Sequence, residues 1–154
     1  MKISGAIFDM DGTLTDSMFI WKEIGNRYLI SCGATPRESL REDTKKLTLL
    51  ETAEYFRTEY GLKKTDKEIY AGVDSLLWPI YRDEVLPKDG VISLLDRLKE
   101  RRIPMVVATA TDRHLVEMVL EKNGLISYFS EIFTTGAVGA GKENPLIFEK
   151  ALEY

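Results

Sequence analysis

The sequence has few of the features that mark secreted, membrane-spanning or nucleic-acid-binding proteins. It contains one cysteine, Cys32, so no intrachain disulfide can form, and a reducing, cytoplasmic compartment is expected. No apolar run approaches the roughly 18 residues that a membrane helix needs, and Asp9 and Asp11 interrupt the N-terminus where the apolar stretch of a signal peptide would lie. Basic residues number 21 against 25 acidic ones, so the net charge of -4 gives no reason to expect a nucleic-acid partner.

What the sequence does contain is enough apolar surface for a packed core. Hydrophobic residues make up 44% of the 154 residues and charged residues 30%, which excludes wholesale disorder. A chain of this length suits one ordinary domain, or one small domain that carries an insertion. Internal repeats and low-complexity stretches are absent from the sequence.

Two types of pattern divide the chain. Short apolar runs at residues 6–8, 105–109 and 132–133 indicate strands, and helical patterns precede or follow the last two. Helix and strand in alternation predict a parallel sheet with right-handed crossovers. We therefore expect an α/β fold with a Rossmann-like parallel sheet core, built from residues 1–16 and 85–154. Residues 17–84 read as helical throughout and form an all-helical insert.

Three helix starts are expected inside this insert. In each, a Thr can accept a hydrogen bond from a free backbone N–H, while a Glu three residues later reaches back to the N–H of that Thr. The pairs are Thr35 with Glu38, Thr48 with Glu51, and Thr65 with Glu68.

The last helix of the insert shows one apolar face and one proline. The spacing predicts that Ile69, Val73, Leu76 and Ile80 point to the same side. Pro79 is expected to kink or end this helix, because proline lacks a backbone N–H and its ring clashes with the preceding turn.

Reactive side chains stand where the predicted strands end. Asp9 and Asp11 follow the first strand, Thr109 ends the second, and Lys142 follows the third. In a doubly wound sheet these ends share one crevice, so the four side chains are expected to converge. Two carboxylates, a hydroxyl and an ammonium suit phosphoryl transfer, in which one carboxylate attacks phosphorus and the other moves protons. Paired carboxylates also favour a bound cation, and oxygen ligands suit Mg²⁺.

Motifs at these positions resemble those of a known family. Residues 8–17, Phe-Asp-Met-Asp-Gly-Thr-Leu-Thr-Asp-Ser, closely resemble the first signature of the haloacid dehalogenase superfamily of phosphohydrolases. Residues 105–109 resemble its second signature, residues 141–145 its third, and residues 86–91 its return from cap to core. A helical cap between the first two signatures is similar to the subgroup of phosphoglycolate phosphatases and β-phosphoglucomutases.

The resemblance implies a role for each candidate residue. Asp9 would be the nucleophile that forms an aspartyl-phosphate, and Asp11 would be the general acid and base. Thr109 and Lys142 would bind the phosphoryl group of a small phosphorylated metabolite. Mg²⁺ would bind the Asp9 carboxylate and the Asp11 carbonyl oxygen. The backbone N–H groups expected to assist are those of Met10, Asp11 and Ala110.

Two departures from the family pattern leave alternatives open. Trp21 stands where mutase relatives tend to carry a histidine, which favours a phosphatase over a phosphosugar mutase. The fourth signature, an acidic pair after a further strand, is missing, because the 12 residues after Lys142 contain no Asp. The core is therefore expected to be incomplete at its C-terminus, either as a piece of a longer protein or as a degenerate, non-catalytic phosphate binder. The first strand would then lie at an open edge and pair with a second molecule or with a missing C-terminal segment.

Two other phosphate-handling folds fit less well. Residues 136–142 nearly match a P-loop, but Glu143 stands where that motif needs a hydroxyl to bind Mg²⁺. A receiver domain would need an aspartate on the third strand, and residues 132–135 offer none.

Overall fold

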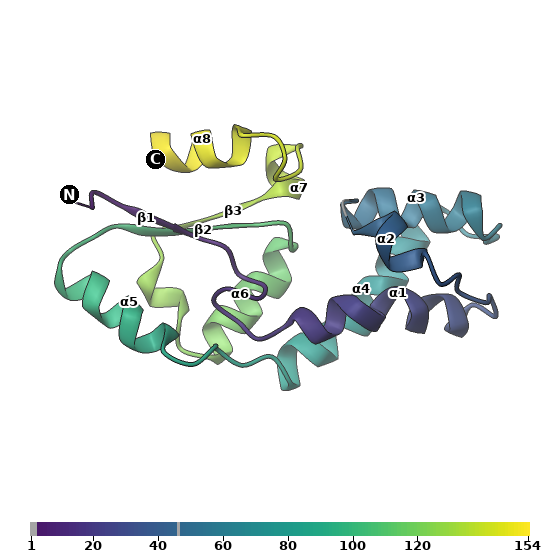
Figure 1. Ribbon diagram of the computed structural model, residues 1–154, viewed down its shortest axis with the longest axis horizontal. Coiled ribbons are helices and arrows are strands. Elements are labelled where there is room, and N and C mark those ends of the chain that lie inside the picture. The colour runs from purple at the N-terminus through teal and green to yellow at the C-terminus, as the bar shows by residue number, and fades with distance from the viewer. Residues whose placement is uncertain (1–2, 46) are drawn as a thin grey trace. The chain divides into compact units, whose positions relative to one another are not determined.

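The computed structural model describes residues 3–45 and 47–154. The chain packs as two compact units: one holds the chain up to Ser17 together with Glu84–Tyr154, and the other is Met18–Asp83 (Figure 1). In these described ranges, no helix is both long enough and apolar enough to cross a membrane.

The first unit contains a three-stranded parallel sheet, as the sequence predicts. The strands stand in the order β1-β2-β3, so β1 lies at an edge. Phe8 pairs with Val107, and Thr109 pairs with Thr134, which places the carboxyl ends of the strands at one edge of the sheet. The central strand is fully buried, whereas β1 is half-buried. The strands are β1 (Ala6–Phe8), β2 (Met105–Thr109) and β3 (Glu131–Thr134).

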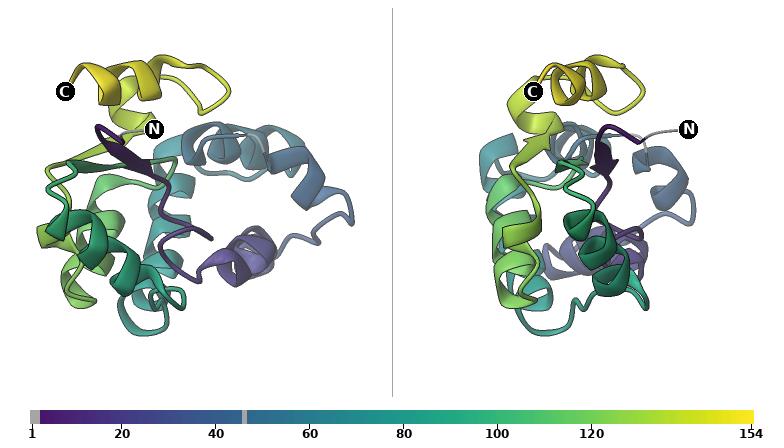
Figure 2. Two further views of the ribbon diagram at one scale, coloured as in Figure 1. Left: turned by 60° about the vertical axis from the view of Figure 1, so that its left-hand side comes forward. Right: turned by 90° about the vertical axis from the view of Figure 1, so that its left-hand side faces the viewer.

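Helices cover both faces of this sheet. The helices α5 and α6 lie on one face and α8 lies on the other (Figures 1 and 2). Each turns apolar side chains inward, among them Leu95, Val119 and Ile147, which are fully buried. A short helix, α7, follows β3 directly. The bounds are α5 (Val91–Glu100), α6 (Arg113–Lys122), a 3-10 helix (Ile126–Tyr128), α7 (Thr135–Val138) and α8 (Leu146–Glu153).

The second unit is helical, and no strand occurs in residues 18–45 or 47–83. The two later capping boxes are confirmed. The Thr48 hydroxyl accepts from the N–H of Glu51 (3.2 Å) while the Glu51 carboxylate accepts from the N–H of Thr48 (2.7 Å). Thr65 and Glu68 exchange the same two bonds, at 3.3 and 2.8 Å. The helices are α1 (Met18–Ser31), α2 (Leu40–Thr44), α3 (Leu49–Glu59) and α4 (Asp66–Asp83).

The helix start predicted at Thr35 is wrong. The next helix begins at Leu40, after Ser39. Tertiary contacts hold the intervening segment instead: the N–H of Arg37 donates to the Tyr60 hydroxyl (3.1 Å), and the Arg37 guanidinium pairs with Glu59 (3.0 Å). These bonds tie the segment to the end of α3, so it does not continue as a helix.

The face predicted for α4 is correct only in its first half. Ile69 and Val73 are buried, but Leu77 and Tyr81 are the buried residues further along, in place of Leu76 and Ile80. Residues four apart form the row that packs against α1 and α3, the two neighbours of α4. The helix also continues through Pro79 to Asp83.

The two segments through which the first unit connects to the second pair with each other. The N–H of Asp16 donates to the carbonyl of Leu86 (2.9 Å), and the N–H of Lys88 donates to the carbonyl of Leu14 (3.0 Å). The pairing is antiparallel. The chain therefore leaves the sheet unit and returns to it at adjacent positions.

Candidate active site

A tight turn follows β1 and positions the two aspartates. It is organised around the carbonyl of Met10, which accepts hydrogen bonds from the backbone N–H groups of Thr13, Leu14 and Thr15 at 2.9–3.2 Å. Gly12 adopts a left-handed conformation with φ of 77°, which a glycine takes without steric cost. The Met10 side chain is fully buried and anchors the turn in the core.

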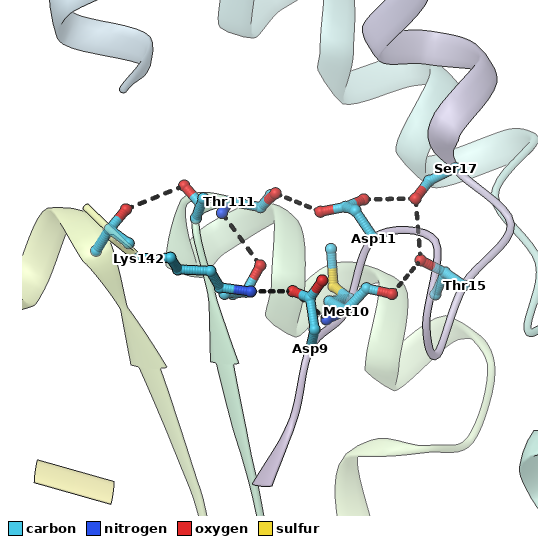
Figure 3. Close-up of polar contacts among 10 residues, drawn as sticks. Asp9, Met10, Asp11, Thr15, Ser17, Thr111 and Lys142 are labelled. Carbon is cyan, nitrogen blue, oxygen red and sulfur yellow. Dashed lines mark hydrogen bonds and ion pairs between the residues drawn. The ribbon is translucent and has the colours of Figure 1, made fainter. Parts of the chain in front are cut away.

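Asp9 and Lys142 meet at the carboxyl edge of the sheet. The Lys142 ammonium forms an ion pair with Asp9 Oδ1, and the N–H of Met10 donates to the same oxygen (2.8 Å; Figure 3). Both side chains are partly exposed, at 39% for Asp9 and 28% for Lys142. The structure thus brings together the expected nucleophile and the expected phosphate-binding lysine, which are 133 positions apart in the sequence. Among the described residues, none donates to Asp9 Oδ2.

Asp11 is held by two hydroxyl groups. Ser17 Oγ donates to Asp11 Oδ1 (2.5 Å), and Thr111 Oγ1 donates to Asp11 Oδ2 (Figure 3). Ser17 is fully buried, and its Oγ also lies 3.1 Å from Thr15 Oγ1, which in turn reaches the Met10 carbonyl (3.2 Å). Both carboxylate oxygens of Asp11 therefore accept hydrogen bonds from fixed, buried side chains.

Thr109 and Ala110 lie in the loop after β2. Thr109 is buried, and its hydroxyl accepts from the N–H of Thr111 (3.2 Å). Ala110 is exposed, and its carbonyl accepts from the hydroxyl of Thr135 (3.4 Å). These bonds shape the loop that carries Thr111 toward Asp11. Neither of these bonds brings Thr109 or Ala110 to Asp9 or Lys142.

Sequence reasoning gave no role to Ser17 or Thr111. Ser17 is the last residue of the first motif, and the motif assigns it no chemical role. Thr111 lies two residues beyond the second motif, in a stretch of Thr-Ala-Thr. One sequence signal points to both residues. Each is a small hydroxyl residue in the loop that follows a strand, and these loops lie at the same edge of the sheet as the Asp11 carboxylate. A serine or threonine hydroxyl carries one O–H group that can donate to a carboxylate oxygen.

The possible metal ligands at this edge are few. In the described parts of the chain, no three His, Cys, Asp or Glu side chains gather closely enough to hold an ion. The oxygens available for a cation are the Asp9 carboxylate and backbone carbonyls of the same turn. Mg²⁺ commonly binds through one or two carboxylates and completes its shell with waters and substrate phosphate, so this donor set fits a weak Mg²⁺ site.

Comparison with known protein families supports the resemblance found in the motifs. The model of the haloacid dehalogenase-like hydrolases matches residues 3–154. Curated relatives include a phosphonoacetaldehyde hydrolase from Bacillus cereus, 27% identical, with 99% of this chain and 64% of the relative covered. A phosphoglycolate phosphatase from Agrobacterium fabrum is 30% identical, with 82% of this chain and 56% of the relative covered. The chain thus spans about three fifths of the length of these relatives.

Solved structures show the same fold. CbbY from Rhodobacter sphaeroides, crystallised with phosphate, superposes with a TM-score of 0.84 at 22% identity, covering 99% of this chain and 72% of that chain. A putative β-phosphoglucomutase from Thermotoga maritima superposes with a TM-score of 0.72 at 25% identity, covering 97% of this chain and 69% of that chain.

Proposed function

Because the chain belongs to the haloacid dehalogenase-like hydrolases, we propose that the protein hydrolyses phosphomonoesters of small metabolites, with Mg²⁺ and through an aspartyl-phosphate on Asp9. The observation that carries the proposal is the Asp9–Lys142 ion pair at the carboxyl edge of a parallel sheet, beside a second, separately held carboxylate. We propose the cytoplasm as its compartment, on the basis of the single cysteine.

Asp9 is suited to attack because its two oxygens differ. Oδ1 is engaged by Lys142 and by the N–H of Met10, whereas Oδ2 is free of hydrogen bonds from the described residues. In the proposed first step an Asp9 oxygen forms a bond to phosphorus, the bond from phosphorus to the leaving oxygen breaks, and Asp11 protonates that oxygen. Lys142 would offset negative charge on the phosphoryl oxygens as the transfer proceeds.

The second step would release phosphate. Water attacks the phosphorus of the aspartyl-phosphate, its proton passes to Asp11, and the bond from phosphorus to Asp9 breaks. The step returns both aspartates to their starting state. Ser17 and Thr111 would act throughout as positioning residues, since each donates to a different oxygen of Asp11.

Mg²⁺ would be held by the Asp9 carboxylate and the Asp11 carbonyl oxygen. When bound, it supplies positive charge against the phosphoryl oxygens. With a single carboxylate as ligand, binding should be weak and should depend on substrate phosphate to complete the shell.

A phosphosugar mutase is the second candidate, because one structural relative is named a putative β-phosphoglucomutase. Trp21 argues against it. Its indole N–H donates to the Tyr81 hydroxyl (3.1 Å), and an indole has no basic atom with which to take up a proton. A phosphate-binding protein without catalytic activity is the third candidate.

Trapping the phosphorylated enzyme separates these candidates. The chain is incubated with Mg²⁺ and a labelled aryl phosphate or phosphosugar, quenched in acid, and treated with hydroxylamine, which cleaves acyl phosphates. We expect label on the wild type, none on Asp9→Asn, and release of inorganic phosphate as the final product. Isomerised phosphosugar as the main product would favour the mutase, and absence of label with retained phosphate binding would favour the binder.

A further inference from the structure

The helical unit carries the single cysteine of the chain in a setting unrelated to the aspartates. Cys32 follows the last turn of α1, and its backbone N–H donates to the carbonyl of Tyr28 (3.1 Å). The Lys64 ammonium, from the loop between α3 and α4, lies 3.6 Å from Cys32 Sγ. The same ammonium lies 5.6 Å from the centre of the Tyr28 ring. A cation, a thiol and a phenol thus gather at one point of this unit.

The Tyr28 hydroxyl is a buried donor whose hydrogen-bonding capacity is not satisfied by a well-formed hydrogen bond within the described residues. Tyr28 is 2% exposed, and its Oη lacks a hydrogen-bond partner in the part of the chain that the structure describes. Burial is the main cause that raises the pKa of Tyr28 to about 12, and the neighbouring Cys32 thiol is a further one. The Lys64 ammonium contacts both the sulfur and the Tyr28 ring, which places the two side chains next to each other.

Packing prevents the Tyr28 ring from turning its hydroxyl elsewhere. One face of the ring stacks on Phe56, with centres 6.0 Å apart and planes 11° apart. On another side lies Gly72 of α4, where an added Cβ would stand 2.5 Å from Tyr28 Cε2. A ring fixed in this way keeps its unsatisfied hydroxyl in one place. Buried donors without a partner are rare, and each calls for an explanation.

We propose that Cys32 is an oxidation site, at which hydrogen peroxide converts the thiol to a sulfenic acid whose oxygen accepts hydrogen bonds from Tyr28 Oη and Lys64 Nζ. In this step sulfur forms a bond to one peroxide oxygen, the O–O bond breaks, and the second oxygen leaves as water after taking the thiol proton. Sulfur is oxidised by two electrons and peroxide is reduced. The added oxygen supplies the acceptor that the Tyr28 hydroxyl lacks.

Access to the sulfur supports this assignment. Cys32 is partly exposed and lines a depression of about 410 Å³, formed by residues 32–34 and 60–64. Peroxide is small enough to enter such a space. The 154 residues contain no second cysteine, so the sulfenic acid has no partner within them for a disulfide. It would persist until a small thiol reduces it or further peroxide oxidises it.

The single cysteine makes the test direct, because any label on the chain reports Cys32. The folded chain is treated with hydrogen peroxide, the sulfenic acid is trapped with dimedone, and intact mass gives the rate and extent of labelling. The variants are Lys64→Gln, which removes the cation, and Tyr28→Phe, which removes only the hydroxyl. Lys63→Gln is the matched control, because Lys63 lines the same depression, whereas the ammonium beside the sulfur is that of Lys64. Circular dichroism verifies that each variant is folded.

We expect the folded chain to form sulfenic acid about tenfold faster than the chain in urea, because a cation and a donor stabilise the developing negative charge. Lys64→Gln should lose most of this increase in rate. Tyr28→Phe should shorten the lifetime of the sulfenic acid before further oxidation. Lys63→Gln should match the wild type in both rate and lifetime. Equal rates in the folded and unfolded chain, or equal behaviour of Lys64→Gln and Lys63→Gln, would overturn the proposal. The readout does not involve phosphate chemistry, so it stands or falls separately from the proposed phosphatase.

Discussion

The Thr111 hydroxyl donates a hydrogen bond to Asp11 Oδ2 across 100 positions of sequence. The contact joins the loop after β2 to the turn after β1, and with Ser17 on the other oxygen it fixes the plane of the Asp11 carboxylate. In the mechanism proposed above, Asp11 delivers a proton to the leaving oxygen, and this transfer would depend on the orientation of the carboxylate, because small displacements at a reacting centre are costly.

Thr111→Val should therefore lower kcat for aryl phosphate hydrolysis about 10- to 100-fold with little change in KM. Valine keeps the shape of threonine and removes the hydroxyl. Thr111→Ser restores the hydroxyl and should recover most of the activity. If the serine variant is as impaired as the valine variant, Thr111 acts through packing and not through its hydrogen bond.

Lys142→Gln should reduce formation of the phosphorylated enzyme by roughly 10²–10³ in rate, the usual effect of removing one stabilising donor at a developing charge. The side chain is partly exposed, so the fold should survive the change. Lys150→Gln serves as the control, because Lys150 lies on exposed α8 surface. Rapid-quench measurement of the hydroxylamine-sensitive label would decide, and an unchanged rate in Lys142→Gln would exclude a role for the ion pair.

Two helical glycines should respond oppositely to alanine. A Cβ at Gly72 would stand 2.5 Å from the fixed Tyr28 ring, so Gly72→Ala should destabilise the helical unit by about 1–3 kcal/mol. At Gly25 the nearest atoms are 3.4 Å from the new Cβ. Gly25→Ala should then gain up to about 1 kcal/mol from helix propensity. Urea unfolding followed by circular dichroism measures both, and equal shifts in the same direction would refute the packing argument.

The Glu51 cap should make stability depend on pH in the acid range. The N–H and hydroxyl of Thr48 hold the pKa of Glu51 below its usual value. A lowered folded pKa stabilises the protein above the unfolded value of about 4.3, and this gain is lost as pH falls through the folded pKa. Because the side chain is exposed, Glu51→Gln should cost only about 0.5 kcal/mol at pH 7. The difference from wild type should vanish below the folded pKa.

Glu54→Gln on the same helix is the control for that experiment. Glu54 is exposed and lies outside the cap. Urea unfolding of the three proteins at pH 7 and at pH 3 gives the comparison. A Glu51→Gln deficit that stays constant between the two pH values would show that the cap does not depend on the carboxylate charge.

The sequence predicts the sheet from local signals, and the sheet in turn predicts that Asp9 and Lys142 converge at its carboxyl edge. Apolar runs identify the strands, and parallel strands necessarily bring their carboxyl ends together. The hydroxyls on Asp11 were not predictable in the same way. Whether Thr111 reaches Asp11 depends on loop conformation after β2, which the Thr109 hydroxyl sets by accepting from the Thr111 N–H.

The errors within the helical unit have the same origin. Thr35 and Glu38 have the spacing of a cap, but contacts of Arg37 with the end of α3 outweigh it. On α4, the choice of Leu77 over Leu76 follows from which row of side chains meets α1 and α3.

In the sheet unit, the short helix α7 depends on local contacts at its two ends. The Thr134 hydroxyl caps its start by accepting from the N–H of Ala137 (3.2 Å), and Gly139 ends it in a left-handed conformation.

The antiparallel pairing of Asp16 with Leu86 and of Leu14 with Lys88 also bears on how such a protein can change over time. The loop-closure cost of an insertion grows only slowly with its length, by about 0.6 kcal/mol for each doubling, so two positions that lie side by side can be joined by segments of very different size. A two- or three-residue hairpin in place of residues 17–85 would join the same positions. The sheet unit can thus accept a different insert at the same two positions while the aspartate turn stays as it is.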